Sequence, residues 1–293
     1  MGLGLVLVAV AAVSWGTTGA TMATLAGLGD IGPLFVGWAR LAVAAPCLVA
    51  VALWRHGRPD APPWPRRDSA LALGLGAAMA AYQLCFFWAV TLTGIAVTAL
   101  LAICSAPLFI ALIAAVVLGE PLAGRLGACL VMAVLGTGLL VAGTRDLSHA
   151  SGGLAAGAAL ALGAGLSYAV YAVAAKRLLD RRPPLLVAAV TFAVGALLLT
   201  PALLVEAAPA PGVLAEGWPL LIYLGVGPTA IAYALFTVGL RRVPATAAGI
   251  VSLLEPLTAS GLGVLLFGER LGPAGFVGAA LLVGALALLS LSR

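Results

Sequence analysis

Residues 253–261 read LLEPLTASG and lie inside a long apolar segment. Both Glu255 and Pro256 are unusual there, because a carboxylate is costly inside a membrane and proline interrupts the hydrogen bonds of a helix. A related pattern occurs 149 residues earlier, where Pro107-Leu108 corresponds to Pro256-Leu257. This correspondence indicates that the chain consists of two related halves.

Other matched segments support the repeat, because their separations are all close to half the chain. In each half, a Gly-Glu pair places its glutamate thirteen residues after the proline. The matched segments are Gly119-Glu120 with Gly268-Glu269, residues 81–84 (AYQL) with 232–235 (AYAL), and Ser14-Trp15 with Ser167-Tyr168. We therefore predict two domains, residues 1–146 and residues 147–293.

The composition requires a lipid environment for most of the protein surface. Of the 293 residues, 63% are hydrophobic and only 9% are charged, and the mean hydropathy is +1.18. Apolar runs of about 20 residues recur, each long enough to cross a bilayer core of about 30 Å. The first run lacks a basic leader and is therefore interpreted as a retained helix. We predict an all-α integral membrane protein with ten helices: 3–26, 33–54, 69–90, 94–118, 126–143, 153–179, 185–206, 218–239, 245–267 and 274–291.

Basic residues concentrate in alternate loops. The richer side has Arg55, Arg58, Arg66, Arg67, Arg125, Lys176, Arg177, Arg181, Arg182, Arg241, Arg242 and Arg293, whereas the opposite loops have only Arg145 and Arg270. Because loops rich in Arg and Lys remain in the cytoplasm, both chain ends are predicted to be cytoplasmic. The same bias explains the net charge of +5 without a nucleic-acid partner.

Two halves of five helices have opposite orientations in the membrane, because five is an odd number. Such inverted repeats are typical of secondary transporters, in which the substrate site lies near the membrane midplane between the halves. The predicted architecture is therefore two inverted five-helix repeats around a central cavity.

These features resemble the drug/metabolite transporter superfamily, in particular its EamA-like ten-helix branch. The likeness covers essentially the whole chain and rests on the five-plus-five helices, on Pro107 and Pro256, and on the two Gly-Glu pairs. Within this branch, the sequence is similar to the bacterial inner-membrane exporters of aromatic and other neutral amino acids of the YddG type. The resemblance implies outward transport through a cavity lined by helices one to four and six to nine, with helices five and ten outside.

Two charged residues lie deep in the predicted helices. Glu255 is about ten residues into helix nine, or roughly 15 Å from its cytoplasmic end. Arg40 lies roughly 10 Å from the outer end of helix two. The two side chains could pair, or they could hold the carboxylate and the ammonium group of an amino acid. Alternatively, Arg40 could extend to the outer surface along its aliphatic chain.

Aromatic and neutral polar side chains occur near the matched segments and are candidate substrate ligands. Rings can stack on an apolar side chain or attract a cation, although an interfacial aromatic belt is the alternative. The candidates are Trp15, Tyr82, Gln83, Phe86, Ser105, Tyr168, Tyr171 and Tyr233. Proline leaves a backbone carbonyl free four residues earlier, so Pro107 and Pro256 could form hinges or expose carbonyls, or could simply be packed kinks.

The remaining motifs have structural explanations. The Gly-Glu pairs are predicted to end helices, with each carboxylate near the N-terminus of the next helix, where the helix dipole favours it. Small residues recur every fourth position in helix six, at Gly153, Gly157, Ala161 and Gly165, which allows close helix packing. The four cysteines lie in apolar runs without metal-ligand spacing, so no cofactor is expected.

The function favoured by the sequence is secondary transport of a small metabolite, most simply export of a neutral or aromatic amino acid by alternating access. The main alternative is an exporter of cationic drugs or other metabolites, with Glu255 and aromatic rings holding the cation. An intramembrane enzyme is disfavoured because no nucleophile has a catalytic partner, and a channel would not need inverted halves. No phosphate-binding GxxxxGK[ST] motif occurs. A monomer is sufficient, because the cavity lies within one chain.

Overall fold

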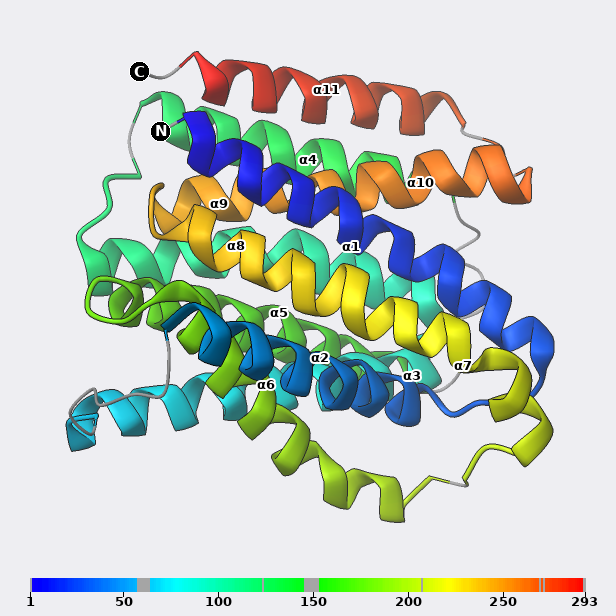
Figure 1. Ribbon diagram of the computed structural model, residues 1–293. Helices are drawn as coiled ribbons and strands as arrows, with labels where there is room; N and C mark the ends of the chain where they lie inside the picture. Colours follow the sequence, from blue (N-terminus) through cyan, green and yellow to red (C-terminus); the bar gives the residue numbers. More distant parts are fainter. Residues whose placement is uncertain are drawn as a thin grey trace.

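The computed structural model describes residues 2–56, 64–122, 124–144, 153–206, 208–268, 270 and 272–291. All regular secondary structure in these residues is helical, and ten segments are long and apolar enough to cross a membrane. The long helices lie side by side, and the two chain ends lie at the same side of the bundle (Figure 1). The predicted all-α membrane architecture is therefore confirmed.

The first half of the chain contains five spans in four helical elements: α1 (Gly2–Leu28), α2 (Pro33–His56), α3 (Arg66–Leu118) and α4 (Arg125–Thr144). The helix α3 contains two spans, which separate at Gly94. Gly94 has φ 76° and ψ 166°, a conformation that a residue with a Cβ rarely adopts. The sequence places the boundary between helices three and four at this glycine.

The second half is more interrupted. Its elements are α5 (Leu154–Leu179), α6 (Pro184–Leu199), the 3₁₀ helix η1 (Thr200–Leu204), α7 (Pro211–Gly225), the π-helix η2 (Val226–Ile231), α8 (Ala232–Leu240), α9 (Ala245–Ser252), α10 (Leu254–Phe267) and α11 (Pro273–Ser290). The predicted start of the eighth span at residue 218 was wrong. The helix begins at Pro211, because the fixed φ of proline suits the first turn of a helix.

Small residues determine how closely the helices approach one another. A Cβ at Gly136 of α4 or at Gly278 of α11 would collide with the backbone of the other helix, and these two helices pack together at the edge of the bundle (Figure 1). Across the two halves, Gly157 and Gly165 of α5 lie against Thr93 and Ser105 of α3. The predicted close packing of helix six is therefore confirmed.

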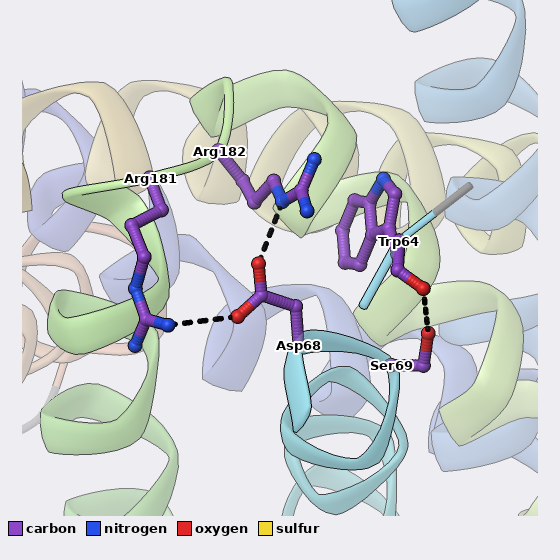
Figure 2. Close-up of polar contacts among 5 residues, drawn as sticks. All are labelled: Trp64, Asp68, Ser69, Arg181 and Arg182. Atoms are coloured by element: carbon purple, nitrogen blue, oxygen red, sulfur yellow. Dashed lines mark hydrogen bonds and ion pairs between the residues drawn. The ribbon is translucent and has the colours of Figure 1, made fainter. Parts of the chain in front are cut away.

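On one side of the bundle, the helix ends and loops contain most of the basic residues. We call this side the basic face. Here Asp68, at the start of α3, accepts hydrogen bonds from Arg181 Nη1 at 3.0 Å and Arg182 Nε at 2.8 Å (Figure 2). The side chain of Asp68 is only 4% exposed, and the Arg182 guanidinium lies 4.9 Å from the ring centre of Trp64. These contacts join the first half to the second.

A second contact between the halves is made by Glu120. Its carboxylate accepts hydrogen bonds from the backbone N–H of Ala245 at 2.6 Å and of Thr246 at 3.0 Å, and from the Thr246 hydroxyl at 2.8 Å. Gly119 has φ 70° and ends α3, as expected. However, the predicted partner was wrong: the carboxylate caps α9 of the other half, since α9 lies beside it in space. The equivalent Glu269 lies outside the described residues.

Glu206 makes the corresponding contact on the opposite face of the bundle. Its carboxylate accepts hydrogen bonds from the backbone N–H groups of Leu34 at 3.2 Å and Phe35 at 2.6 Å, in the first turn of α2. Carboxylates at helix N-termini satisfy unpaired N–H groups and interact favourably with the helix dipole. Carboxylates therefore join the two halves on both faces of the bundle, Asp68 and Glu120 on the basic face and Glu206 on the opposite face.

Candidate functional site

Aromatic rings gather between the two halves in what we call the central aromatic cluster. Its members are Trp15 of α1, Tyr82 and Phe86 of α3, Tyr168 and Tyr171 of α5, Phe192 of α6, and Tyr233 and Phe236 of α8. The ring of Trp15 lies 4.8 Å from Tyr233, 5.3 Å from Phe236 and 6.3 Å from Tyr168, measured between ring centres. All the aromatic candidates from the sequence belong to this cluster.

Several buried polar atoms in and beside the cluster have no hydrogen-bond partner among the described residues. They are Trp15 Nε1, Thr18 Oγ1, Tyr168 OH, Tyr171 OH and Thr191 Oγ1. The Ser252 hydroxyl lies close to that of Tyr168 without hydrogen-bond geometry, and it already donates to the Ala248 carbonyl. Because an unsatisfied buried polar group is unfavourable, this concentration indicates a site for a polar ligand or water.

Arg40 points from α2 toward the second half of the protein. Its Nε donates a hydrogen bond to Thr229 Oγ1 at 3.2 Å, and the Thr229 hydroxyl donates to the Leu224 carbonyl at 2.6 Å. Thr229 lies in the π-helix η2, an irregularity often found at functional sites. Among the described residues, this is the only hydrogen bond of the Arg40 guanidinium, so its terminal nitrogens have no other protein acceptor there.

Glu255 lies where the ninth span is interrupted. The helix α9 ends at Ser252, and α10 begins at Leu254, which places Glu255 in the first turn of α10. The N-terminal end of a helix stabilises a carboxylate. Glu255 is half-buried, and its backbone carbonyl lies against Gly16, next to the cluster residue Trp15. The interruption is local, because Leu253 keeps a right-handed helical conformation with φ −70° and ψ 0°.

The charges of Arg40 and Glu255 interact electrostatically across the boundary between the halves. The ion pairs found among the described residues do not include these two side chains, so their charged groups are not in direct contact. Tyr82, a member of the central aromatic cluster, interacts electrostatically with both. The arrangement therefore presents one cation, one anion and several aromatic rings to a common region.

The other candidate residues lie at helix contacts. The Gln83 side chain is 2% exposed and donates from Nε2 to the Gly37 carbonyl at 3.1 Å, which joins α3 to α2. Ser105 donates to the Ala102 carbonyl and lies against Gly165. The helix α3 continues through Pro107, whereas the ninth span is interrupted at Leu253, three residues before Pro256.

Ser105 also lies on an apolar groove, of about 420 Å³, between α3, α4 and α5. The groove is lined mainly by aliphatic side chains, including Leu101, Leu108 and Leu135. In the described part of the chain, no group of three or more His, Cys, Asp or Glu side chains could hold a metal ion.

The sequence matches the EamA-like transporter family over residues 2–142 and again over residues 155–291. The chain belongs to this family. The two matches correspond to the two halves of the bundle. A crystal structure with 24% sequence identity superimposes with a TM-score of 0.83, covering 98% of this chain and 97% of that one, which shows that the fold is shared.

Curated relatives of this EamA-like transporter are also transporters. An uncharacterized transporter of Bacillus subtilis, YwfM, is 36% identical over 97% of this chain and 92% of its own length. The threonine/homoserine exporter RhtA of Salmonella typhimurium is 34% identical over 48% of this chain, and that of Escherichia coli is 32% identical over 49%. The chain covers only 46% to 47% of the length of these exporters. The protein is therefore a transporter of small molecules and not an enzyme.

The structure adds residues that the sequence did not indicate. Thr229 supports Arg40, and Phe192 adds a ring to the central aromatic cluster. Glu206 caps α2 of the other half. For the other cap, that of α9 by Glu120, the sequence did contain a signal. The helix α9 follows Pro244 and has no Ser, Thr, Asp or Asn at its N-cap, so its first N–H groups need an acceptor from elsewhere.

Proposed function

We propose that this EamA-like transporter exports neutral amino acids and binds them between Arg40 and Glu255. The Arg40 guanidinium binds the substrate carboxylate, because it can donate two parallel hydrogen bonds to a planar acceptor. Glu255 accepts hydrogen bonds from the substrate ammonium group. The substrate side chain then lies against the central aromatic cluster, and the larger area of an aromatic side chain favours stronger binding.

The observation that carries this proposal is the separation of the two charges. Arg40 and Glu255 interact electrostatically but make no ion pair with each other. A zwitterion placed between them neutralises both charges. In addition, Tyr168 OH, Tyr171 OH and Trp15 Nε1 offer hydrogen-bonding atoms that have no partner among the described residues.

The relatives support an amino acid as substrate. The name of RhtA assigns it export of threonine and homoserine, both neutral amino acids, although it matches only about half of this chain. The aromatic rings beside Glu255 extend the expected range to aromatic amino acids, as in exporters of the YddG type. The proposal includes two domains, residues 1–146 and residues 147–293. A monomer is sufficient for transport. The protein lies in a bacterial inner membrane with both chain ends in the cytoplasm.

Transport by alternating access is supported by the position of the proposed site between inverted halves. Rocking of one half against the other would expose the site to each side of the membrane in turn. The interruption before Pro256 supplies a place where α9 and α10 can change their relative angle, and Pro107 occupies the matched position in α3. A gradient of substrate or of protons could drive the movement, with Glu255 as the proton carrier.

A second candidate function is export of aromatic cations. It is favoured by the electrostatic interaction of Glu255 with Tyr82 of the central aromatic cluster, because a cation would interact with both the carboxylate and the ring faces. Arg40 opposes this function, since its positive charge faces the same region.

Counterflow in liposomes that contain the purified protein separates these functions. We would use labelled neutral, aromatic and acidic amino acids, together with one aromatic dication. Exchange of neutral or aromatic amino acids without movement of the dication is expected. Arg40→Gln and Glu255→Gln should each lower exchange about 10- to 100-fold, because each removes a charge-assisted hydrogen bond to the substrate.

Arg67→Gln and Glu216→Gln are matched controls, because both side chains are exposed and neither belongs to the central aromatic cluster. They should exchange substrate like the unaltered protein. Normal exchange by folded Arg40→Gln and Glu255→Gln would exclude the proposed site. Movement of the dication alone would instead support the cation exporter.

A further inference from the structure

A second hollow lies on the basic face, between the ends of α2, α6 and α8. Its volume is about 540 Å³. It is lined by three arginines and three apolar residues: Arg55, Arg241, Arg242, Pro184, Leu185 and Val238. We call it the arginine pocket. It lies between the first half, which supplies α2, and the second half, which supplies α6 and α8.

The arginine pocket has an excess of positive charge. In the described part of the chain, the ion pairs are those of Asp68 with Arg181 and Arg182, so no acidic side chain there pairs with the three pocket arginines. Arg242 donates from Nη1 to the Val238 carbonyl at 2.9 Å, which holds it in place. Three like charges around one hollow repel each other, and an anion within the hollow would remove that repulsion.

The surroundings of the pocket indicate which anion fits. Trp54, beside Arg55, is 81% exposed, and tryptophan side chains of membrane proteins concentrate at the level of the lipid headgroups. The Arg55 guanidinium lies 5.9 Å from the Trp54 ring centre, so the charge is held at the same level. Leu185 and Val238 add apolar surface that suits the start of an acyl chain.

We propose that the arginine pocket binds the phosphate of an anionic phospholipid. Guanidinium groups bind phosphate oxygens in pairs, and basic pockets between membrane helices suit anionic headgroups. The bound lipid contacts both α2 of the first half and α8 of the second. It therefore joins the halves on the basic face, where Asp68 and Glu120 also join them.

Native mass spectrometry of the full chain in a neutral detergent tests this proposal. Phosphatidylglycerol and phosphatidylcholine would be titrated separately. We expect a saturable phosphatidylglycerol adduct and a much weaker phosphatidylcholine adduct. Arg55→Gln combined with Arg241→Gln should weaken phosphatidylglycerol binding by about 25-fold, or about fivefold per arginine. Arg242 is left unchanged because of its hydrogen bond to α8.

The matched control combines Arg66→Gln with Arg67→Gln, which removes the same charge from exposed positions on the same face. It should bind phosphatidylglycerol like the unaltered protein. Equal weakening in both double variants, or no saturable adduct in the unaltered protein, would overturn the proposal. Displacement of the lipid by an equal concentration of inorganic phosphate would also overturn it, because the pocket would then be a site for the free anion.

Discussion

The centre of the bundle and its basic face differ in whether their polar groups have hydrogen-bond partners within the protein. On the basic face, Asp68 binds two arginines, and Lys176 Nζ donates to the carbonyls of Leu240, Arg241 and Val243. In the central aromatic cluster, the hydroxyl of Tyr171 has no partner among the described residues, although its side chain is completely buried.

This contrast separates polar groups that hold the helices together from polar groups that are available to a substrate. Asp68 and Lys176 on the basic face are paired within the protein and contribute to its stability. The unpaired groups at the centre are unfavourable for stability until a ligand or water binds them. Substitutions of these paired groups on the basic face should therefore lower stability, whereas substitutions of the unpaired groups at the centre should mainly alter transport.

Asp68→Asn should have the largest effect on stability. The substitution leaves Arg181 and Arg182 without their carboxylate, and removal of one partner from a buried ion pair is strongly destabilising. Because Arg181 is 43% exposed, we expect a loss of about 2 kcal/mol in the free energy of unfolding. Unfolding in mixed micelles measures this loss. Asp180→Asn, at an exposed position near the same arginines, should change stability little. Equal stability of the two variants would contradict a stabilising role for the ion pairs of Asp68.

Glu120→Gln should have a somewhat smaller effect. The amide keeps an oxygen acceptor but loses the charge that interacts with the N-terminus of α9, so we expect a loss of about 1 kcal/mol. The same unfolding measurement applies. Glu216→Gln, at an exposed position in α7, is the control. If Glu120→Gln were as stable as the control, the contact of the Glu120 carboxylate with Ala245 and Thr246 would contribute nothing to stability.

Thr229→Val tests the support of Arg40. Valine has a similar shape but cannot accept the hydrogen bond from Arg40 Nε, so the guanidinium should be less well positioned. We expect the substrate concentration at half-maximal exchange to rise about fivefold, as for the loss of one hydrogen bond. Thr237→Val is the control, because Thr237 donates only to carbonyls of its own helix. A fivefold rise in the control as well would remove the special role of Thr229.

Tyr171→Phe should have the smallest effect on stability. Its hydroxyl has no partner to lose, so we expect a change below about 0.5 kcal/mol, with a reduction in amino-acid exchange if the substrate uses this hydroxyl. Tyr223→Phe is the comparison, because the Tyr223 hydroxyl lies 2.8 Å from the Thr17 hydroxyl. If Tyr171→Phe destabilised the protein by more than 1 kcal/mol, the contrast between centre and face would be wrong.

Most of the architecture could be predicted from the sequence, because span length and loop charge are local properties. The ten spans follow from apolar runs, and the turn at Gly94 lies where a glycine occurs between two such runs. Most members of the central aromatic cluster could be identified from the sequence, because they are aromatic residues near the matched segments. The pairing of Glu120 with α9 could not be predicted, since it depends on which helix ends lie together.

The sequence by itself determined the number of spans, the two halves and the excess of basic residues in alternate loops. Only the tertiary structure decided that Arg40 binds Thr229, and that the buried hydroxyl of Tyr171 has no partner among the described residues. The physical reason is that helices in lipid can be apolar on every face, so their sequences contain little information about which face is turned inward. Packing between the two halves determines that rotation.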